Sequence, residues 1–490
     1  MRLGPDLLDR LPAAVARPRY DREAVGCGVV HLGIGAFHRA HQAVYFDDVL
    51  AGGETEWGIA AASLRSPDTR DALEPQNGLY TLAVRAGDGE ALRVIGSVQQ
   101  VLVAPEDPER LIALLADPRI RIVTLTITEK GYCHDPATGA LKEDHPDVVH
   151  DLGDLFRPRS ALGFLAAALA GRFAAGTPPF TIVSCDNLPA NGKTLKAVLD
   201  RFCALVSDEL GQWVRDEVCC PSSMVDRIVP ATTDEDRARV SAALGVTDAW
   251  PVMTEPFTQW VLEDRFPNGR PDLAAVGVEL VDDVEPFEHM KLRLLNGSHS
   301  TLAYLGYLGG YQTVSETMAD PAYARLVRGL MDEEATPTLH MPPGTDLTAY
   351  KDALIERFRN PALKHRTWQI AMDGSQKLPQ RLLGTIRDRL AAGASIDRLA
   401  LGVAAWMRYV TGVDEKGEPI DVRDPMASRF KDIAAAAGNP ETLAASLIGI
   451  REIFGDDLPA EPRFIRPVKE ALASLYRVGA RATVAETAGR

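Results

Sequence analysis

The sequence has few cysteines, and their number and spacing argue against a disulfide framework and a zinc site. Only six cysteines occur among 490 residues, and no two of them form a CxxC pair. The adjacent pair Cys219 and Cys220 has a poor spacing for zinc, so we expect reduced, mostly buried thiols. The histidines His38, His41 and His134 lack a third ligand at a suitable spacing, and we therefore expect no metal site.

Long apolar runs and an excess of positive charge are also missing. No apolar run approaches the roughly 18 residues that a membrane span requires. The first residues carry scattered charges and lack the apolar core of a signal peptide, so we expect a cytoplasmic protein without a membrane partner. Acidic residues outnumber basic ones by 68 to 53, giving a formal charge of −15. This balance argues against a nucleic-acid partner, which requires a basic surface. As to its oligomeric state, we expect a monomer or a weak homodimer.

Two kinds of pattern divide the chain. In the first half, short β-rich runs at 29–32, 57–60, 121–127 and 180–185 alternate with helical patterns, and a helix that begins at Ala161 ends near Gly176. This alternation predicts βαβ units and a parallel sheet. Later segments are mainly helical, at 346–358, 399–410 and 432–454. The predicted fold is therefore an α/β, Rossmann-type dinucleotide-binding domain (1–285) joined to a mainly α-helical C-terminal domain (286–490).

A glycine turn follows the first predicted strand and comprises Gly33, Ile34, Gly35, Ala36 and Phe37. The first glycine permits a tight turn, and the second lets the backbone approach a pyrophosphate. The helix that follows offers unpaired N–H groups to the anion. Histidine replaces the third glycine of the usual motif, so a purely structural tight turn stays open as an alternative.

An acidic residue beyond the second strand would hold the ribose hydroxyls of NAD. Asp68 is the candidate, although it lies later than the usual spacing, and an aspartate that merely starts a helix is the alternative. Arg65 lies nearby and would suit a 2′-phosphate. The sequence therefore predicts NAD and leaves NADP open.

Three polar residues fall on one predicted helix. At about 100° per residue, Asn296 lies roughly 140° from Lys291 and His299 roughly 80° from it, so all three share one half of the helix surface. A lysine whose pKa is lowered by burial can take a proton from an alcohol. An amide can donate to the alcohol oxygen, and an imidazole can hold the lysine or a substrate hydroxyl. A solvated lysine, a surface asparagine and a core histidine are the alternative.

Further polar residues follow predicted strands. Asn187 comes after the run at 180–185, and Glu129 comes after the run at 121–127. Because the carboxyl ends of parallel strands line the ligand crevice, both would face a site, although a turn rich in Asn, Pro and Gly also explains Asn187. Asp226 lies among apolar neighbours and pairs with Arg227 or Lys291, or forms an ordinary salt bridge.

Taken together, these stretches resemble the mannitol dehydrogenase family, the polyol-specific long-chain dehydrogenases, over nearly the whole chain. The matching segments are GIGAFHRAHQ from Gly33, TLTITEKGYC from Thr124, SCDNLPANG from Ser184, MVDRIVP from Met224, EPFTQWVLED from Glu255, MKLRLLNGSHS from Met290 and DGSQKLPQR from Asp373. The histidine in the glycine turn is part of the family's own pattern. The resemblance implies zinc-independent oxidation of a secondary alcohol with NAD, or with NADP.

The resemblance also implies roles for individual residues. Lys291 matches the family's general base, and Asn187 and Asn296 match the amides that hold the reacting oxygen. His299 matches the residue that binds a substrate hydroxyl and orients the lysine.

Glu129 and Asp226 match positions that the family places near the site or its proton path.

The substrate implied by the resemblance is a small sugar acid or polyol. Gln369 stands where the mannitol branch carries an arginine, so this segment is similar to the fructuronate reductase branch, and we expect D-mannonate and D-fructuronate. Segments at Leu64 and Asp248 are more similar to the mannitol branch, which leaves mannitol 2-dehydrogenase activity as the alternative.

A uronate substrate requires a cation for its carboxylate. Arg366 and Lys377 are candidates, together with Arg293 and Arg381, and an ordinary surface charge is the alternative for each. A catalytically inactive nucleotide-binding protein is a remote alternative to an enzyme. Such a protein would keep the glycine turn but would not need the lysine, asparagine and histidine on one helix.

Overall fold

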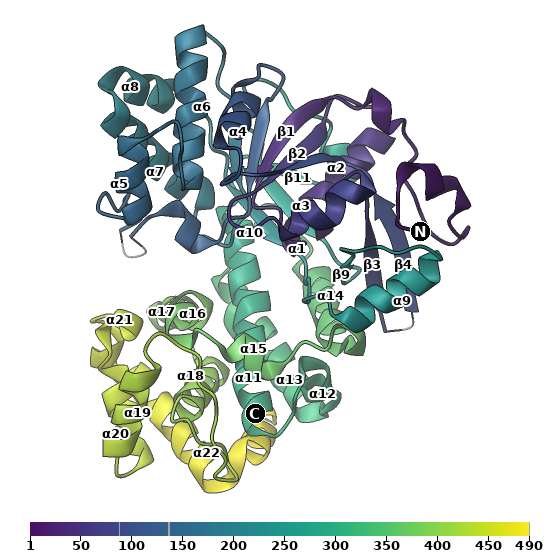
Figure 1. Ribbon diagram of the computed structural model, residues 1–490. Helices are drawn as coiled ribbons and strands as arrows, with labels where there is room; N and C mark the ends of the chain where they lie inside the picture. The colour runs from purple at the N-terminus through teal and green to yellow at the C-terminus, as the bar shows by residue number, and fades with distance from the viewer. Residues whose placement is uncertain (88, 136–137, 490) are drawn as a thin grey trace. The chain divides into compact units, whose positions relative to one another are not determined.

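The computed structural model (Figure 1) describes residues 1–87, 89–135 and 138–489 of the chain. These residues form two compact units, Met1–Glu285 and Pro286–Arg490. The first unit is an α/β structure and the second is mainly helical, which confirms the predicted fold class. Among the described residues, no helix is both long enough and apolar enough to cross a membrane.

A five-stranded, fully parallel sheet forms the centre of the first unit, in the order β5-β2-β1-β6-β7. Successive side chains of a strand point to opposite faces, so both faces of this sheet need cover. Val30 and Leu32 pack on one face with α4, α6 and α7, whereas Val29 packs on the other with α2 and Trp260. The strands are β1 (Cys27–Leu32), β2 (Gly58–Ser63), β5 (Val98–Val103), β6 (Ile122–Leu125) and β7 (Thr181–Ser184). The covering helices are α2 (Gln42–Ala51), α4 (Pro108–Ala116), α6 (Ala161–Ala175) and α7 (Asn191–Val206).

The strand order reverses direction between β1 and β6. From β1 the chain builds outward through β2 to β5, and it then returns to place β6 and β7 on the opposite side of β1. In open α/β sheets, such a reversal leaves a crevice at the carboxyl ends of the two central strands. The segments after β1 and β6 are therefore where a ligand of this unit belongs.

Smaller elements complete the first unit. Two three-stranded sheets have the orders β4-β3-β9 and β11-β10-β8. The helix predicted after the glycine turn is not continuous, because the backbone leaves helical geometry at His41 (φ −126°, ψ −91°) and separates α1 from α2. The strands are β3 (Tyr80–Ala86), β4 (Gly89–Ile95), β8 (Ser223–Asp226), β9 (Val252–Thr254), β10 (Gln259–Glu263) and β11 (Glu279–Val281). The helices are α1 (Ala36–Ala40), α3 (Asp68–Leu73), α5 (Pro146–Gly153), α8 (Asp208–Glu217) and α9 (Asp234–Leu244), and α10 (Glu285–Met290) starts at the boundary between the units.

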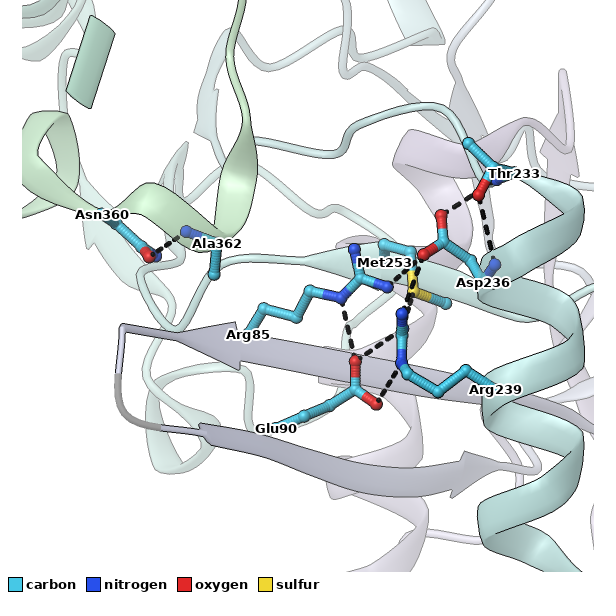
Figure 2. Close-up of polar contacts among 8 residues, drawn as sticks. All are labelled: Arg85, Glu90, Thr233, Asp236, Arg239, Met253, Asn360 and Ala362. Atoms are coloured by element: carbon cyan, nitrogen blue, oxygen red, sulfur yellow. Dashed lines mark hydrogen bonds and ion pairs between the residues drawn. The ribbon is translucent and has the colours of Figure 1, made fainter. Parts of the chain in front are cut away.

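An ion-pair network joins α9 to strands β3 and β4 (Figure 2). Arg85 donates to Glu90 at 2.9 Å and to Asp236, and Arg239 donates to the same two carboxylates at 2.8 and 3.1 Å. Thr233 and Asp236 also form a capping box at the start of α9. Although burial opposes the charge, these hydrogen bonds hold the pKa of Asp236 below its usual range.

Helix α18 (Asp397–Tyr409) is the central helix of the second unit. Every residue from Leu399 to Tyr409 is buried, and α18 packs against α11 (Ser298–Leu308) and α22 (Pro462–Ala488). No strand occurs among residues 286–489. In Figure 1 the yellow α22 bends sharply, because Gly479 has non-helical angles (φ 81°, ψ 171°). The other helices are α12 (Val314–Ala319), α13 (Pro321–Gly329), α14 (Leu347–Arg359), α15 (Thr367–Ala371), α16 (Gly374–Leu378), α17 (Gly384–Ala391), α19 (Ala427–Ala436), α20 (Pro440–Ile448) and α21 (Arg451–Phe454).

Candidate functional site

A pocket of about 520 Å³ opens at the strand-order reversal of the first unit, and we call it the glycine-turn pocket. Its volume lies within the range of small-molecule sites. The glycine turn, the end of β2 and the segment after β6 supply most of the wall, and α5 and α6 complete it. The lining residues are Gly33, Ile34, Gly35, Ser63, Leu64, Arg65, Ser66, Thr69, Thr126, Ile127, Thr128, Lys130, Gly131, Cys133, Asp147, Arg159, Ser160 and Ala161.

The two glycines of the turn serve different purposes. Gly33 has φ +99°, and a Cβ on it would lie 2.2 Å from the carbonyl oxygen of Thr126, so the fold itself requires glycine. At Gly35 the backbone is extended, and a Cβ would meet no atom closer than 3.9 Å. Because Gly35 lines the pocket, the space that its missing side chain leaves open is available to a ligand approaching the backbone. This cradle suits the pyrophosphate of a dinucleotide.

The buried side chain of His31 stabilises the glycine turn by hydrogen bonding. Its Nδ1 lies 2.7 Å from Oγ1 of Thr124, and its Nε2 lies 3.1 Å from the Gly33 carbonyl and 2.9 Å from Oγ1 of Thr126. Burial lowers the pKa of His31 to about 3, so the ring is neutral. This role of His31 was not among the predictions. A single polar residue inside an otherwise apolar strand was the available signal.

Only part of the predicted cofactor-binding set lines this pocket. Gly33, Ile34 and Gly35 do so, whereas Ala36 and Phe37 form the start of α1 and are not among the lining residues. Asp68, predicted to hold the ribose, is also outside the lining. Its Oδ2 accepts a hydrogen bond of 3.0 Å from Ser66 Oγ, and the residue begins α3, as the alternative reading of the sequence allowed.

Asp186 ties the end of β7 to the loop after β6. Its carboxylate accepts hydrogen bonds from the backbone N–H groups of Ile127 (2.9 Å) and Thr128 (3.0 Å) and from the hydroxyl of Tyr132 (2.7 Å). Burial raises the pKa of Asp186 despite these bonds. Thr128 has φ +63°, a strained value for a β-branched residue and one often found at functional sites.

Glu129 follows this strained residue and begins a short 3₁₀ turn, Glu129–Tyr132. The strand predicted over 121–127 is shorter than expected and ends at Leu125, so Glu129 stands on the loop and not directly at the strand end. Its side chain is exposed and is not part of the pocket lining, although the neighbouring Thr128 and Lys130 are.

Asn191 fixes the loop that carries Asn187. Its amide nitrogen donates to the carbonyls of Ser184 (3.1 Å), Asp186 (3.1 Å) and Ser223 (2.8 Å), and its oxygen accepts from the Ser223 N–H at 2.9 Å. The side chain is only 2% exposed. One buried amide therefore joins the ends of β7 and β8 and sets where the loop with Asn187 begins.

Asp226 is the last residue of β8 and is 5% exposed. Its neighbour Arg227 directs its guanidinium to backbone carbonyls, donating to Ala40 at 2.6 Å and to Glu255 at 3.1 Å. Burial lowers the pKa of Arg227 to about 10, so it remains cationic at neutral pH.

The lysine and asparagine of the second unit lie on a π-helix, which corrects the geometry predicted for them. Residues Lys291–Gly297 form i→i+5 hydrogen-bonded turns between α10 and α11. In such turns residue i lies over residue i+5, so Asn296 lies on the same side as Lys291 and not roughly 140° away as an α-helix requires. Lys291 is 7% exposed and Asn296 is half-buried.

A second π-helical segment, Pro379–Leu383, packs against the first one. A Cβ on Gly297 would lie 2.7 Å from the carbonyl oxygen of Arg381, so only glycine permits this approach of the two backbones. π-Helical turns are rare, and they recur at functional sites because they widen the helix and re-aim its side chains.

His299 begins the helical face beyond the first π-helix. The ring is 8% exposed, and its Nε2 is buried without a hydrogen-bond partner among the described residues. It stacks on Phe358 with a centroid distance of 5.3 Å and packs edge-on to His365 at 4.7 Å. Burial, the neighbouring His365 and the positive charges of Arg381, Arg357 and Lys377 lower its pKa well below the usual range. A neutral imidazole with an unsatisfied nitrogen is suited to bind a hydroxyl group.

The candidate cations of the second unit differ in their surroundings. Arg366 is exposed and is not among the charges that act on His299. Arg293 pairs with Asp388 at 2.6 Å. Lys377 donates to the carbonyl of Met372 at 2.6 Å, and Arg381 donates to Ser300 Oγ at 3.0 Å. Both Lys377 and Arg381 act on His299, and so does Arg357, a buried cation that the sequence analysis did not name.

The predicted site residues therefore form two groups, one in each unit. Asn187, Glu129 and Asp226 belong to the first unit, and Lys291, Asn296 and His299 belong to the second. Within the described part of the chain, no group of three or more His, Cys, Asp or Glu side chains is arranged to hold a metal ion.

Comparison with known proteins identifies relatives that match nearly the whole chain. The model of the mannitol dehydrogenase Rossmann domain matches residues 27–275, and that of the mannitol dehydrogenase C-terminal domain matches residues 283–476. A D-mannonate oxidoreductase of Escherichia coli is 48% identical over 96% of this chain and 98% of its own. A mannitol 2-dehydrogenase of Phaeosphaeria nodorum is 42% identical over 97% of this chain and 84% of its own.

A solved structure also matches the entire chain. It is the Pseudomonas fluorescens mannitol 2-dehydrogenase, in a ternary complex with NAD and D-mannitol. It is 42% identical, with a TM-score of 0.89 and complete coverage of both chains.

Proposed function

Because the chain belongs to the mannitol dehydrogenase family, we propose that it is an NAD(P)-dependent, zinc-independent oxidoreductase interconverting a secondary alcohol and a ketone. The observation that carries the proposal is the buried Lys291, which shares a π-helix with Asn296, followed by a neutral His299 at the start of α11. This set offers a proton acceptor, an amide donor and a hydroxyl-binding group, which are the three functions that alcohol oxidation requires of side chains.

The glycine-turn pocket is the proposed cofactor site. Gly33, Ile34 and Gly35 would hold the pyrophosphate, since the open cradle at Gly35 lets the backbone approach it. When bound, a nicotinamide dinucleotide supplies the hydride acceptor for oxidation and the hydride donor for reduction. The related Pseudomonas fluorescens enzyme, solved with NAD, supports this assignment.

Each polar residue then has a proposed role at the reacting carbon. The buried Lys291 takes the hydroxyl proton in oxidation and returns it in reduction. The amides of Asn187 and Asn296 donate to the oxygen while it carries negative charge. The unpartnered Nε2 of His299 binds a neighbouring substrate hydroxyl.

Glu129 and Asp226 are proposed to relay protons near the site. Both are carboxylates of the first unit, and a carboxylate can pass a proton between a buried base and solvent. Glu129 is exposed and Asp226 is buried.

The proposed substrate pair is D-mannonate and D-fructuronate. The 48% identity to a D-mannonate oxidoreductase, against 42% to a mannitol 2-dehydrogenase, supports this choice. Gln369, in place of the arginine of the mannitol branch, agrees with it. The positive charge around His299, from Arg381, Arg357 and Lys377, would suit a carboxylate, whereas the other candidate, Arg366, is exposed.

One panel of initial rates tests the proposal. Fructuronate, tagaturonate and fructose are each reduced with NADH, and mannonate and mannitol are each oxidised with NAD. Fructuronate should give the highest kcat/KM. Fructose reduction that far exceeds fructuronate reduction would instead assign the chain to the mannitol 2-dehydrogenases, and no turnover with any of the five would refute the enzyme itself.

A further inference from the structure

The imidazole of His365, on the segment between α14 and α15, lies against the imidazole of His299. The centroids of the two rings are 4.7 Å apart, and their planes meet at 68°. Phe358 of α14 stacks on His299 with a centroid distance of 5.3 Å and an interplanar angle of 22°. His299 therefore has an apolar ring stacked on it and a second imidazole beside it, all within the second unit.

Hydrogen bonds fix the backbone that carries His365. Its carbonyl accepts a bond of 3.0 Å from the N–H of Val314, and the N–H of Thr367 donates to the Gln312 carbonyl at 3.0 Å. The hydroxyl of Thr367 also donates to the carbonyls of Tyr311 at 3.1 Å and Gln312 at 3.2 Å. The segment is thus held on both sides of the imidazole, which suits a side chain that must keep its place for a ligand.

Neither imidazole has a hydrogen-bond partner in the part of the chain that the structure describes. His299 is 8% exposed with a buried Nε2, and His365 is half-buried. Burial and the charge of Arg357 lower the pKa of His365 to about 4, so it is neutral at neutral pH, as His299 is. A neutral imidazole has one donor and one acceptor nitrogen. Since buried polar groups are normally hydrogen-bonded, two adjacent imidazoles of this kind indicate a polar ligand.

We propose that His365 binds a second substrate hydroxyl beside the one bound by His299, so that the two rings together recognise two adjacent hydroxyl groups. This inference rests on the proposed function and specifies the class of substrate that its site selects. His299 and Lys291 lie on one continuous helical run, whereas His365 comes from a separate segment. His299 therefore takes the hydroxyl next to the reacting carbon, and His365 takes the next one along the chain. Each hydroxyl can donate and accept, which matches a neutral imidazole.

The first test uses the wild-type chain alone. kcat/KM for reduction with NADH is measured for fructuronate and for two deoxy analogues. One analogue lacks the hydroxyl adjacent to the ketone, and the other lacks the next hydroxyl along the chain. Each analogue should give a kcat/KM lower by about tenfold or more, because a site built to bind a hydroxyl leaves its own polar groups unpaired when that hydroxyl is missing.

The second test uses His365→Phe, which keeps an aromatic ring against His299 but removes both ring nitrogens. Its kcat/KM for fructuronate should fall by about tenfold or more. Its kcat/KM for the analogue without the second hydroxyl should be unchanged, because that analogue has no group for His365 to bind. Discrimination against the analogue without the first hydroxyl should persist. His340→Phe, at an exposed histidine of the same unit, is the matched control and should leave all three values unchanged.

The outcomes separate this inference from the proposed function. If the wild type reduces fructuronate and the analogue without the second hydroxyl with equal kcat/KM, the role of His365 is wrong and the proposed function stands. An equal loss for all three substrates in His365→Phe would show that the ring only packs against His299, which also overturns the role. If His365→Phe does not fold, the wild-type comparison decides. No reduction of fructuronate or fructose by the wild type would refute the proposed function itself.

Discussion

Replacing each glycine of the turn by alanine should separate what the fold needs from what the cofactor needs. In Gly33→Ala the new Cβ would lie 2.2 Å from the Thr126 carbonyl oxygen, on a backbone with φ +99°. Backbone strain costs about 1–3 kcal/mol, and overpacking costs about 1–3 kcal/mol. Together they should lower the free energy of unfolding by about 2–6 kcal/mol.

Gly35→Ala should behave in the opposite way. The backbone at Gly35 is extended (φ −91°, ψ −173°), which alanine adopts without strain, and the Cβ has 3.9 Å of room. Stability should therefore stay within about 0.5 kcal/mol of the wild type or rise slightly. The methyl group enters the pocket, so the affinity for NADH should fall at least tenfold.

Urea unfolding followed by circular dichroism measures the first quantity, and NADH fluorescence titration measures the second. Gly53→Ala is the control, since Gly53 has φ +102° but no atom within 4 Å of its Cβ position. It reports the cost of a positive φ without a clash. The reasoning is refuted if Gly33→Ala costs no more than Gly53→Ala, or if Gly35→Ala binds NADH as the wild type does.

Two further predictions concern buried polar groups. Asn191→Ala removes the amide that accepts from the Ser223 N–H and donates to the carbonyls of Ser184, Asp186 and Ser223, so urea unfolding should show a loss of about 3 kcal/mol. A loss below about 1 kcal/mol would show that water replaces the amide. Asp236 has a folded pKa below 3.8, so its stabilising effect is complete above that pH and is lost as the pH falls through the folded value. Asp236→Asn should accordingly lower the free energy of unfolding by about 2 kcal/mol at pH 7, and by progressively less below pH 3.8. The control Asp234→Asn, at a side chain that is 97% exposed, should change the free energy of unfolding little at either pH. An equal loss for Asp236→Asn at pH 7 and at pH 2 would contradict this prediction.

The sequence contains enough information for the fold class because that class depends on local patterns. The β-rich runs coincide with β1, β2, β6 and β7, and the helix expected at 346–358 is α14, which Asp346 caps through its side chain. Gly176 likewise ends α6 in the left-handed conformation. These features are set by residues within one turn or one strand.

Features that depend on contacts between distant residues were not predictable in the same way. The π-helix at Lys291–Gly297 coincides with the close approach of Gly297 to the carbonyl of Arg381, and no periodicity of the segment itself reveals it. Asn187 is the residue predicted from its motif, whereas the hydrogen bonds of that segment centre on Asp186 and Asn191, whose partners lie 5 to 59 residues away. Arg357 is distant in sequence from His299, and only the packing of α14 reveals that the two are close.

The central claim is that Lys291 is the acid–base group of a dinucleotide-dependent oxidoreductase. The most direct measurement compares kcat for fructuronate reduction, and the Kd for NADH, between the wild type and Lys291→Ala. The account predicts at least a hundredfold loss of kcat, as for other general acid–base groups, with the NADH Kd unchanged. Turnover within tenfold of the wild type would contradict it.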